Sequence, residues 1–72
     1  MNRDSRNVFE VPVWQRYLLT VEEAAGYYHI GEGKIRNIVE EHPLADFVIR
    51  NGNRVLIKKA QFELYLDGAT AV

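Results

Sequence analysis

Cationic side chains gather between residues 34 and 59 of this 72-residue chain. Residues 34–59 carry six cations against three acidic residues, a net charge of +3, while the rest carries three cations against seven acidic residues, a net charge of −4. Lysine and arginine bind phosphate oxygens through charge-assisted hydrogen bonds. A basic pole on a chain of net charge −1 therefore favours weak, oriented binding to DNA over tight non-specific binding. The six cations are Lys34, Arg36, Arg50, Arg54, Lys58 and Lys59.

A helix beginning at Glu32 or Gly33 and ending at His42 would position the first of these cations. Pro43 ends it, because proline cannot continue a helix. Its free face starts with Gly33 and basic or amide residues and becomes acidic at Glu40 and Glu41. The opposite face is an apolar stripe at helical spacing, made of Ile35, Ile38, Val39 and His42, with His42 expected to be partly buried.

The start of that free face has side chains suited to reading DNA. Recognition helices present their N-terminal residues to base edges, where arginine pairs best with guanine and asparagine with adenine. Arg36 and Asn37 are therefore predicted to contact bases. Lys34, Arg54 and Lys58 are predicted to neutralise phosphates and orient the domain.

A shorter helix is predicted before it. Thr20 and Glu23 have the spacing of a capping box, which begins a helix by satisfying its first backbone N–H groups. Gly26 suggests a close approach of a second helix, and Gly31 is expected to end this helix as a C-terminal cap. The apolar stripe of this helix is Val21, Ala24, Ala25 and Tyr28.

Residues 47–57 predict a β-hairpin, because Asn51-Gly52 lies between β-forming residues. A three-residue loop of Asn51, Gly52 and Asn53 pairs Ile49 with Val55 and Phe47 with Ile57, and it leaves Arg50 and Arg54 together on the other face. A two-residue loop of Asn51 and Gly52 would place Ile49 opposite Arg54, so the longer loop is preferred. The arginine pair suggests a nearby anion, although charges that protect an exposed edge strand remain the alternative.

The flanking segments complete the expected domain at residues 11–68. Residues 1–10 predict a solvated tail, in which minor-groove contact by Arg3 and Arg6 is the less favoured reading. Residues 11–19 predict an edge strand or extended lead-in, with Trp14 and Tyr17 on the core rather than stacked on bases. A last helix is predicted to start at Lys58 and Lys59, and whether this lysine pair contacts phosphate or solvent is left open. Its apolar side is Phe62, Tyr65 and Leu66. Gly68 ends it, before a tail at residues 69–72.

Composition narrows the classes of function. Without cysteine, the chain has no disulfide and no cysteine-bound metal, and its apolar runs are too short for a membrane span or a signal peptide. The two histidines lack metal-ligand spacing and a neighbouring nucleophile. We therefore expect one small cytoplasmic domain with no enzyme activity, no metal and no cofactor.

Three runs of residues resemble the excisionases of conjugative transposons, and more broadly the excisionase-type winged helices related to MerR-like DNA-binding domains. The resemblance extends from residue 12 to about residue 66. It implies an α+β winged helix-turn-helix with about three helices, a two-stranded hairpin wing and an extended N-terminal segment. The three runs are residues 12–24, 28–34 and 51–63.

The resemblance also implies a function. Such proteins bind double-stranded DNA near attachment sites, bend it and help a tyrosine integrase excise a mobile element, without catalysis of their own. By position, the major-groove residues would be Gly33, Lys34, Arg36 and Asn37, and the wing on the backbone or minor groove would be Arg50, Asn51, Asn53 and Arg54. Gly33 and the Glu40-Glu41 pair depart from the more basic family helix, which implies low affinity for one site and cooperation between neighbouring copies.

Two other functions are compatible with the same fold. A transcriptional regulator would use it at a promoter, and a protein-interaction module would retain the basic wing only for solubility. An adjacent integrase gene would favour the excisionase, whereas the interaction module predicts no salt-dependent affinity for DNA. The segment from Phe62 to Val72 is expected, by analogy, to meet the integrase.

Overall fold

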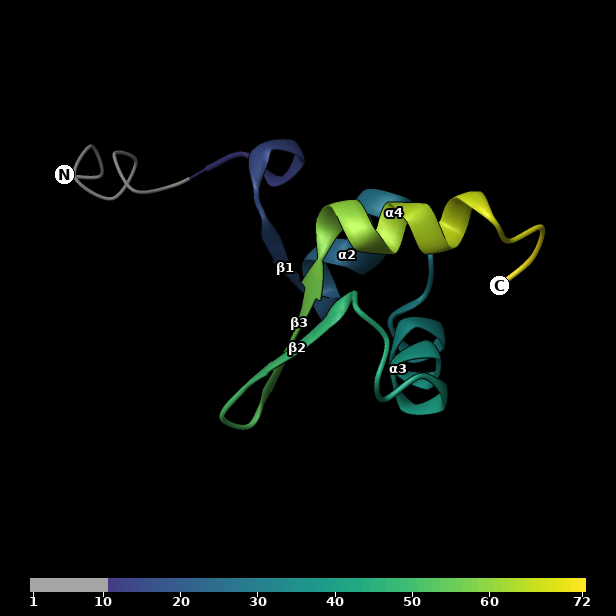
Figure 1. Ribbon diagram of the computed structural model, residues 1–72. Helices are drawn as coiled ribbons and strands as arrows, with labels where there is room; N and C mark the ends of the chain where they lie inside the picture. The colour runs from purple at the N-terminus through teal and green to yellow at the C-terminus, as the bar shows by residue number, and fades with distance from the viewer. Residues whose placement is uncertain (1–10) are drawn as a thin grey trace, which may run out of the picture.

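Three α-helices pack around a three-stranded antiparallel sheet in the computed structural model, which describes residues 11–72 (Figure 1). This arrangement confirms the predicted α+β winged helix-turn-helix. The expected tail at residues 1–10, with Arg3 and Arg6, lies outside the described residues. In chain order the elements are η1 (Val13–Gln15, a 3₁₀ turn), β1 (Leu18–Thr20), α2 (Val21–Tyr28), α3 (Glu32–Glu41), β2 (Val48–Asn51), β3 (Arg54–Lys58) and α4 (Lys59–Asp67).

The sheet has the strand order β1-β3-β2, with β3 in the centre. The expected N-terminal edge strand forms only at its end, where Leu18 pairs with Lys58 and Thr20 with Leu56. The hairpin of β2 and β3 extends beyond this three-stranded part as the wing (Figure 1). One end of the hairpin is therefore anchored in the sheet, while its tip is left to project.

The core lies where the sheet meets the three α-helices. Phe62 of α4 is fully buried, and its ring centroid lies 5.2 Å from that of Phe47 and 5.4 Å from that of Tyr28. The predicted apolar stripes of α2 and α4 face this core, as do Ile35, Ile38 and Val39 of α3. Its nine buried side chains are Leu19, Val21, Ala24, Ile35, Ile38, Val39, Phe47, Ile57 and Phe62.

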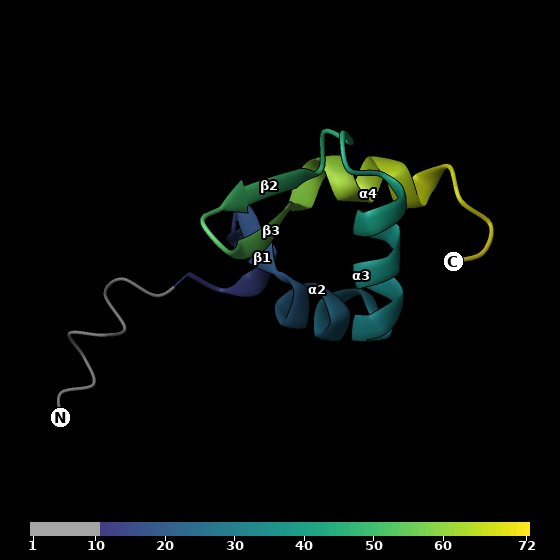
Figure 2. The same cartoon turned by 90° about the horizontal axis from the view of Figure 1, so that it is seen from below.

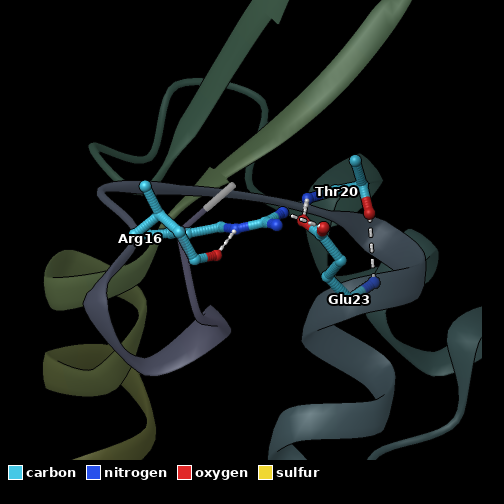
Figure 3. A network of polar contacts seen from close by, with 4 residues as sticks. Arg16, Thr20 and Glu23 are labelled. Carbon is cyan, nitrogen blue, oxygen red and sulfur yellow. Dashed lines mark hydrogen bonds and ion pairs between the residues drawn. The ribbon is translucent and has the colours of Figure 1, made fainter. Parts of the chain in front are cut away.

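The start of α2 is fixed by the predicted capping box and by an arginine that the sequence did not single out. Thr20 Oγ1 accepts from the Glu23 backbone N–H at 3.1 Å, and Glu23 Oε1 accepts from the Thr20 N–H at 2.9 Å. Arg16 donates from Nη1 to the other Glu23 carboxylate oxygen and from Nε to the Val11 carbonyl (Figure 3). This network ties the N-terminal lead-in to the first turn of α2.

Trp14 and Tyr17 do not pack on the core, contrary to the expectation from sequence. Their exposed fractions are 62% and 65%. The 3₁₀ turn brings Val13 against the core instead. Because Arg16 is held by Glu23, the segment is fixed by a polar contact and its two large aromatic side chains stay in solvent.

The turn between α2 and α3 also differs from the prediction. His29, not Gly31, ends α2 in the left-handed conformation (φ 60°, ψ 39°). Gly31 is extended and begins α3, with its carbonyl accepting from the Ile35 N–H at 3.1 Å. The predicted close approach at Gly26 is also wrong, since a Cβ there would meet nothing within 4 Å.

The ends of α3 and α4 follow the predicted signals more closely. α3 ends at Glu41, directly before His42 and Pro43, and α4 ends before Gly68. His42 is exposed rather than partly buried. It is the C-terminal cap of α3, and its ring packs edge-on to Tyr65 at 5.5 Å between centroids.

A polar contact joins α2 to α4 beside the core. The Tyr28 hydroxyl donates to Glu63 Oε2 at 2.9 Å, and Lys59 Nζ lies 3.1 Å from the same oxygen. Burial, followed by the bond to Glu63, raises the pKa of Tyr28 above its usual 10.0. The bonds from Tyr28 and then Lys59 lower the pKa of Glu63 below 4.5.

We expect Tyr28→Phe to lower the free energy of unfolding by about 1 kcal/mol near neutral pH, because it removes this hydrogen bond. A lowered carboxyl pKa stabilises the fold above pH 4.5 and loses its effect as the pH falls. A raised tyrosine pKa stabilises the fold below pH 10.0 and loses its effect as the pH rises. Urea unfolding at several pH values should show the largest difference in the free energy of unfolding between Tyr28→Phe and the parent protein between pH 4.5 and pH 10.0.

Tyr17→Phe is the matched control, because it removes the same hydroxyl from a side chain that is 65% exposed. It should change the free energy of unfolding by less than about 0.5 kcal/mol. Equal losses for the two variants would contradict a role for the Tyr28–Glu63 bond.

Candidate nucleic-acid interface

α3 and the tip of the wing project to the same side of the molecule, away from α4 (Figure 1). Seen from below, the wing lies on one side and α3 on the other, with the start of α2 between them (Figure 2). α3 is positioned by its buried stripe, which packs Ile35, Ile38 and Val39 on the core. Its opposite face, with Gly33, Arg36 and Asn37, is left exposed as predicted.

Two adjoining grooves separate the wing from the helices. The first, which we call the wing groove, has a volume of about 270 Å³ and is lined by Thr20, Val21, Glu22, Arg36, Asn53, Arg54 and Val55. The second has a volume of about 100 Å³ and is lined by Val21, Arg36, Val39, Glu40, Arg50 and Val55. Arg36 lines both grooves, together with Arg54 in the first and Arg50 in the second.

The pairing of the wing differs from both predicted registers. Asn51 pairs with Arg54 and Arg50 with Val55, which leaves a two-residue turn of Gly52 and Asn53. Gly52 has a φ of +65° and Asn53 does not have a positive φ, the sign pattern of a type II′ turn with glycine first. The preferred three-residue loop is therefore wrong, as is the Asn51-Gly52 alternative.

This register separates the two wing arginines. Paired residues point to the same face of a sheet and successive residues to opposite faces, so Arg50 shares a face with Val55, and Arg54 shares the other face with Asn51. The predicted side-by-side arginine pair does not form. A nearby anion was expected because two adjacent arginines would repel each other, and in this register they are not adjacent. Each arginine nevertheless lines a groove with Arg36.

Arg36 is held by two carboxylates. Its Nη2 lies 3.6 Å from Glu22 Oε2 of α2 and 3.7 Å from Glu32 Oε1, one turn earlier in α3. The Arg36 side chain is 51% exposed. The i,i+4 spacing of Glu32 and Arg36 is a sequence signal for such a pair. The pair with Glu22 has no local signal, because it depends on how α2 packs against α3.

Lys34 lies on the opposite flank of α3 from Arg36, roughly 200° around the helix. Its Nζ donates to the Val72 backbone carbonyl at 2.8 Å. The two predicted α3 contacts with DNA therefore leave the helix on different sides, with Gly33 and Asn37 between them. Gly33 is open, since a Cβ there would meet nothing within 4 Å.

The lysine pair at the start of α4 lies apart from the grooves. Lys58 ends β3 and lies about 13 Å along the strand from Arg54. Lys59 is largely buried, with a side chain 17% exposed that pairs with Glu63 and has Nζ 5.5 Å from the centre of the Tyr27 ring. The sequence left open whether this lysine pair contacts phosphate or solvent. Lys59 does neither in the structure, because it contacts Glu63 and Tyr27.

Within the described part of the chain, no three histidine, cysteine or acidic side chains are grouped so that they could hold a metal ion. No helix over residues 11–72 is long and apolar enough to cross a membrane. The wing and α3 together present three arginines, Arg36, Arg50 and Arg54, with the carboxylates of Glu22 and Glu40 beside them. Such a surface is suited to phosphates and base edges.

Comparison with known proteins gives matches over most of the chain. A family profile described as "Excisionase from transposon Tn916" matches residues 1–72. A curated protein of Streptococcus agalactiae serotype V (strain ATCC BAA-611 / 2603 V/R), with the same description, is 48% identical over 63 residues. The aligned part covers 88% of this chain and 94% of that protein.

Proposed function

This chain belongs to the excisionase family of transposon Tn916, and from that premise we propose that it is a DNA-bending accessory protein. It binds double-stranded DNA near the ends of a mobile element and assists a tyrosine integrase in excision. It does so in the cytoplasm and contributes no catalytic step of its own. Neighbouring copies on the DNA compensate for weak binding to a single site.

The observation that carries this proposal is the convergence of Arg36, Arg50 and Arg54 on adjoining grooves. These residues come from a helix and a hairpin that are separated in sequence. The major groove admits a helix, so the first turns of α3 enter it and Arg36 and Asn37 meet base edges. The wing then lies along the backbone or minor groove, where Arg50 and Arg54 bind phosphates and Asn51 and Asn53 flank them.

Lys34 and Lys58 are assigned further contacts with phosphate. Lys34 contacts phosphate on the flank of α3 away from the wing once its contact with the Val72 carbonyl is released. Lys58 adds a more distant phosphate contact. The end of α4 and the tail after it lie away from the wing (Figure 1), and within the segment from Phe62 to Val72 we assign the exposed residues, not the buried Phe62, to the integrase.

Arg54→Ala should weaken binding to all DNA sequences alike, because Arg54 is assigned to phosphate. The slope of log K against log salt should become shallower by about one. Fluorescence anisotropy at several salt concentrations measures both quantities. Lys58→Ala removes the same charge outside both grooves and should weaken binding less; a larger loss for Lys58→Ala would contradict the assignment of the wing.

A direct test of the function uses an element from which the gene for this protein has been deleted. Supplying the protein should restore excision, scored by amplification across the rejoined chromosomal site. Supplying a variant with both Arg36 and Arg54 changed to alanine should not restore it. Equal excision with this folded double variant would contradict the proposed function.

A further inference from the structure

Glu22 is an acidic residue inside an otherwise cationic groove. It lies in the first turn of α2 and lines the wing groove with Arg36, Asn53 and Arg54. Its Oε2 is 3.6 Å from Arg36 Nη2. A phosphate that entered this groove would therefore meet a carboxylate as well as two guanidinium groups.

The pair with Glu22 is a poor explanation for the stability of the fold. The Glu22 side chain is 64% exposed and that of Arg36 is 51% exposed, and ion pairs in such positions stabilise proteins little. Arg36 also has a partner within its own helix, Glu32 at 3.7 Å. The position of Glu22 therefore points to an effect on what Arg36 binds.

Both carboxylates contact the same nitrogen of Arg36. Glu22 Oε2 and Glu32 Oε1 lie 3.6 and 3.7 Å from Nη2. A guanidinium group carries five donors in a rigid fork. Two carboxylates near one nitrogen favour one orientation of the fork, and its other donors remain suited to a second, planar partner.

We propose that Glu22 is a positioning residue that determines specificity by acting through Arg36. Its carboxylate offsets the charge of Arg36 and so reduces attraction to phosphates, which every DNA sequence offers. It also orients the guanidinium group, so that the remaining donors meet a guanine edge. This inference rests on the proposed function, because it needs Arg36 to face DNA.

The two effects predict opposite changes on two kinds of DNA. On a duplex without the proper base, Arg36 acts only as a cation, and Glu22 opposes binding. On the proper site, the ordered fork loses less freedom on binding, and Glu22 supports the base contact. Removal of the Glu22 charge should therefore raise non-specific affinity without raising specific affinity.

The experiment is anisotropy titration of the full chain and its Glu22→Gln variant with two duplexes, one from the ends of the element and one of shuffled sequence. We expect Glu22→Gln to bind the shuffled duplex about fivefold more tightly. Its affinity for the element-end duplex should stay the same or fall, so the ratio of specific to non-specific affinity should fall by at least about fivefold. Thermal unfolding followed by circular dichroism checks that the variant is folded.

Glu41→Gln is the matched control. It changes the net charge equally, but Glu41 lies on the far flank of α3 and lines neither groove. This variant should shift binding to both duplexes by the same factor. In a background of Arg36→Ala, Glu22→Gln should no longer change the ratio, because a residue that acts through Arg36 has no effect without it.

Two results would overturn the inference. One is a Glu22→Gln variant that, like the control, raises both affinities by the same factor. The other is a change of ratio that persists without Arg36. Absence of binding by the parent protein to either duplex at low salt would instead overturn the proposed function itself.

Discussion

Phe62→Ala should lower the free energy of unfolding by about 3–5 kcal/mol, the usual effect of truncating a buried phenylalanine. Phe62 is fully buried, and its ring packs on those of Tyr28, Phe47 and Tyr65 at 5.2–5.9 Å between centroids. These partners come from α2, from the segment that leads into β2 and from α4. The cavity would therefore open at the point where the helices meet the sheet.

A domain of this size has little stability to lose. At roughly 0.05–0.15 kcal/mol per residue, its whole free energy of unfolding is about 4–11 kcal/mol. Phe62→Ala is therefore expected to populate the unfolded state strongly at 37 °C, as measured by urea and thermal unfolding with circular dichroism. Leu64→Ala, in the same helix but 70% exposed, should cost less than about 0.5 kcal/mol. Similar losses for both would contradict the assigned core.

Arg36→Ala should relax the preference for one base pair of the DNA site by about 1–3 kcal/mol. Arg36 is the one charged side chain that lines both grooves, and the two carboxylates near its Nη2 leave other donors available for a base edge. Titration of a set of duplexes, each with one base pair changed, would show the preference disappear at a single position. The fold should be nearly unaffected, because exposed ion pairs contribute little stability.

Arg36→Lys separates charge from geometry in the same assay. Lysine keeps the positive charge but lacks the planar fork, so it should restore much of the attraction to phosphate and little of the base preference. Lys34→Ala is a second comparison, because Lys34 lies on the other flank of α3 and bonds to the Val72 carbonyl. Loss of base preference in Lys34→Ala, with none in Arg36→Ala, would contradict the assignment of the reading residue.

Local signals predicted most of the helices. The Thr20–Glu23 capping box, the proline after His42 and the helical spacing of apolar residues each depend on neighbours within one or two turns. Such interactions are the same in a short segment as in the folded chain. The bounds of α3 and α4 and the core side of each helix were therefore predictable.

The wing shows why register was harder to predict. Alternation of apolar residues fits more than one loop length, since Ile49 can face several apolar partners on the next strand. The choice depended on the backbone of Gly52, whose positive φ allows a two-residue turn with Asn53. A shift of pairing then moved Arg50 and Arg54 to opposite faces.

The sequence marked residues that the fold brings together, but it did not predict the contacts between them. The sequence marked Arg36, Arg50 and Arg54, and the fold brings them to adjoining grooves. It did not mark Glu22 as a partner of Arg36, because that contact depends on the packing of α2 against α3. Arg16 was missed for the same reason, since its bond to Glu23 depends on the path of the lead-in.

The most direct test of the central claim is anisotropy binding of the protein to a duplex from the ends of its element and to a shuffled duplex, at several salt concentrations. We predict tighter binding to the element-end duplex and a steep loss of affinity as salt rises, because arginines of α3 and the wing neutralise phosphates. Absence of binding to either duplex at low salt would contradict the assignment of this face to DNA.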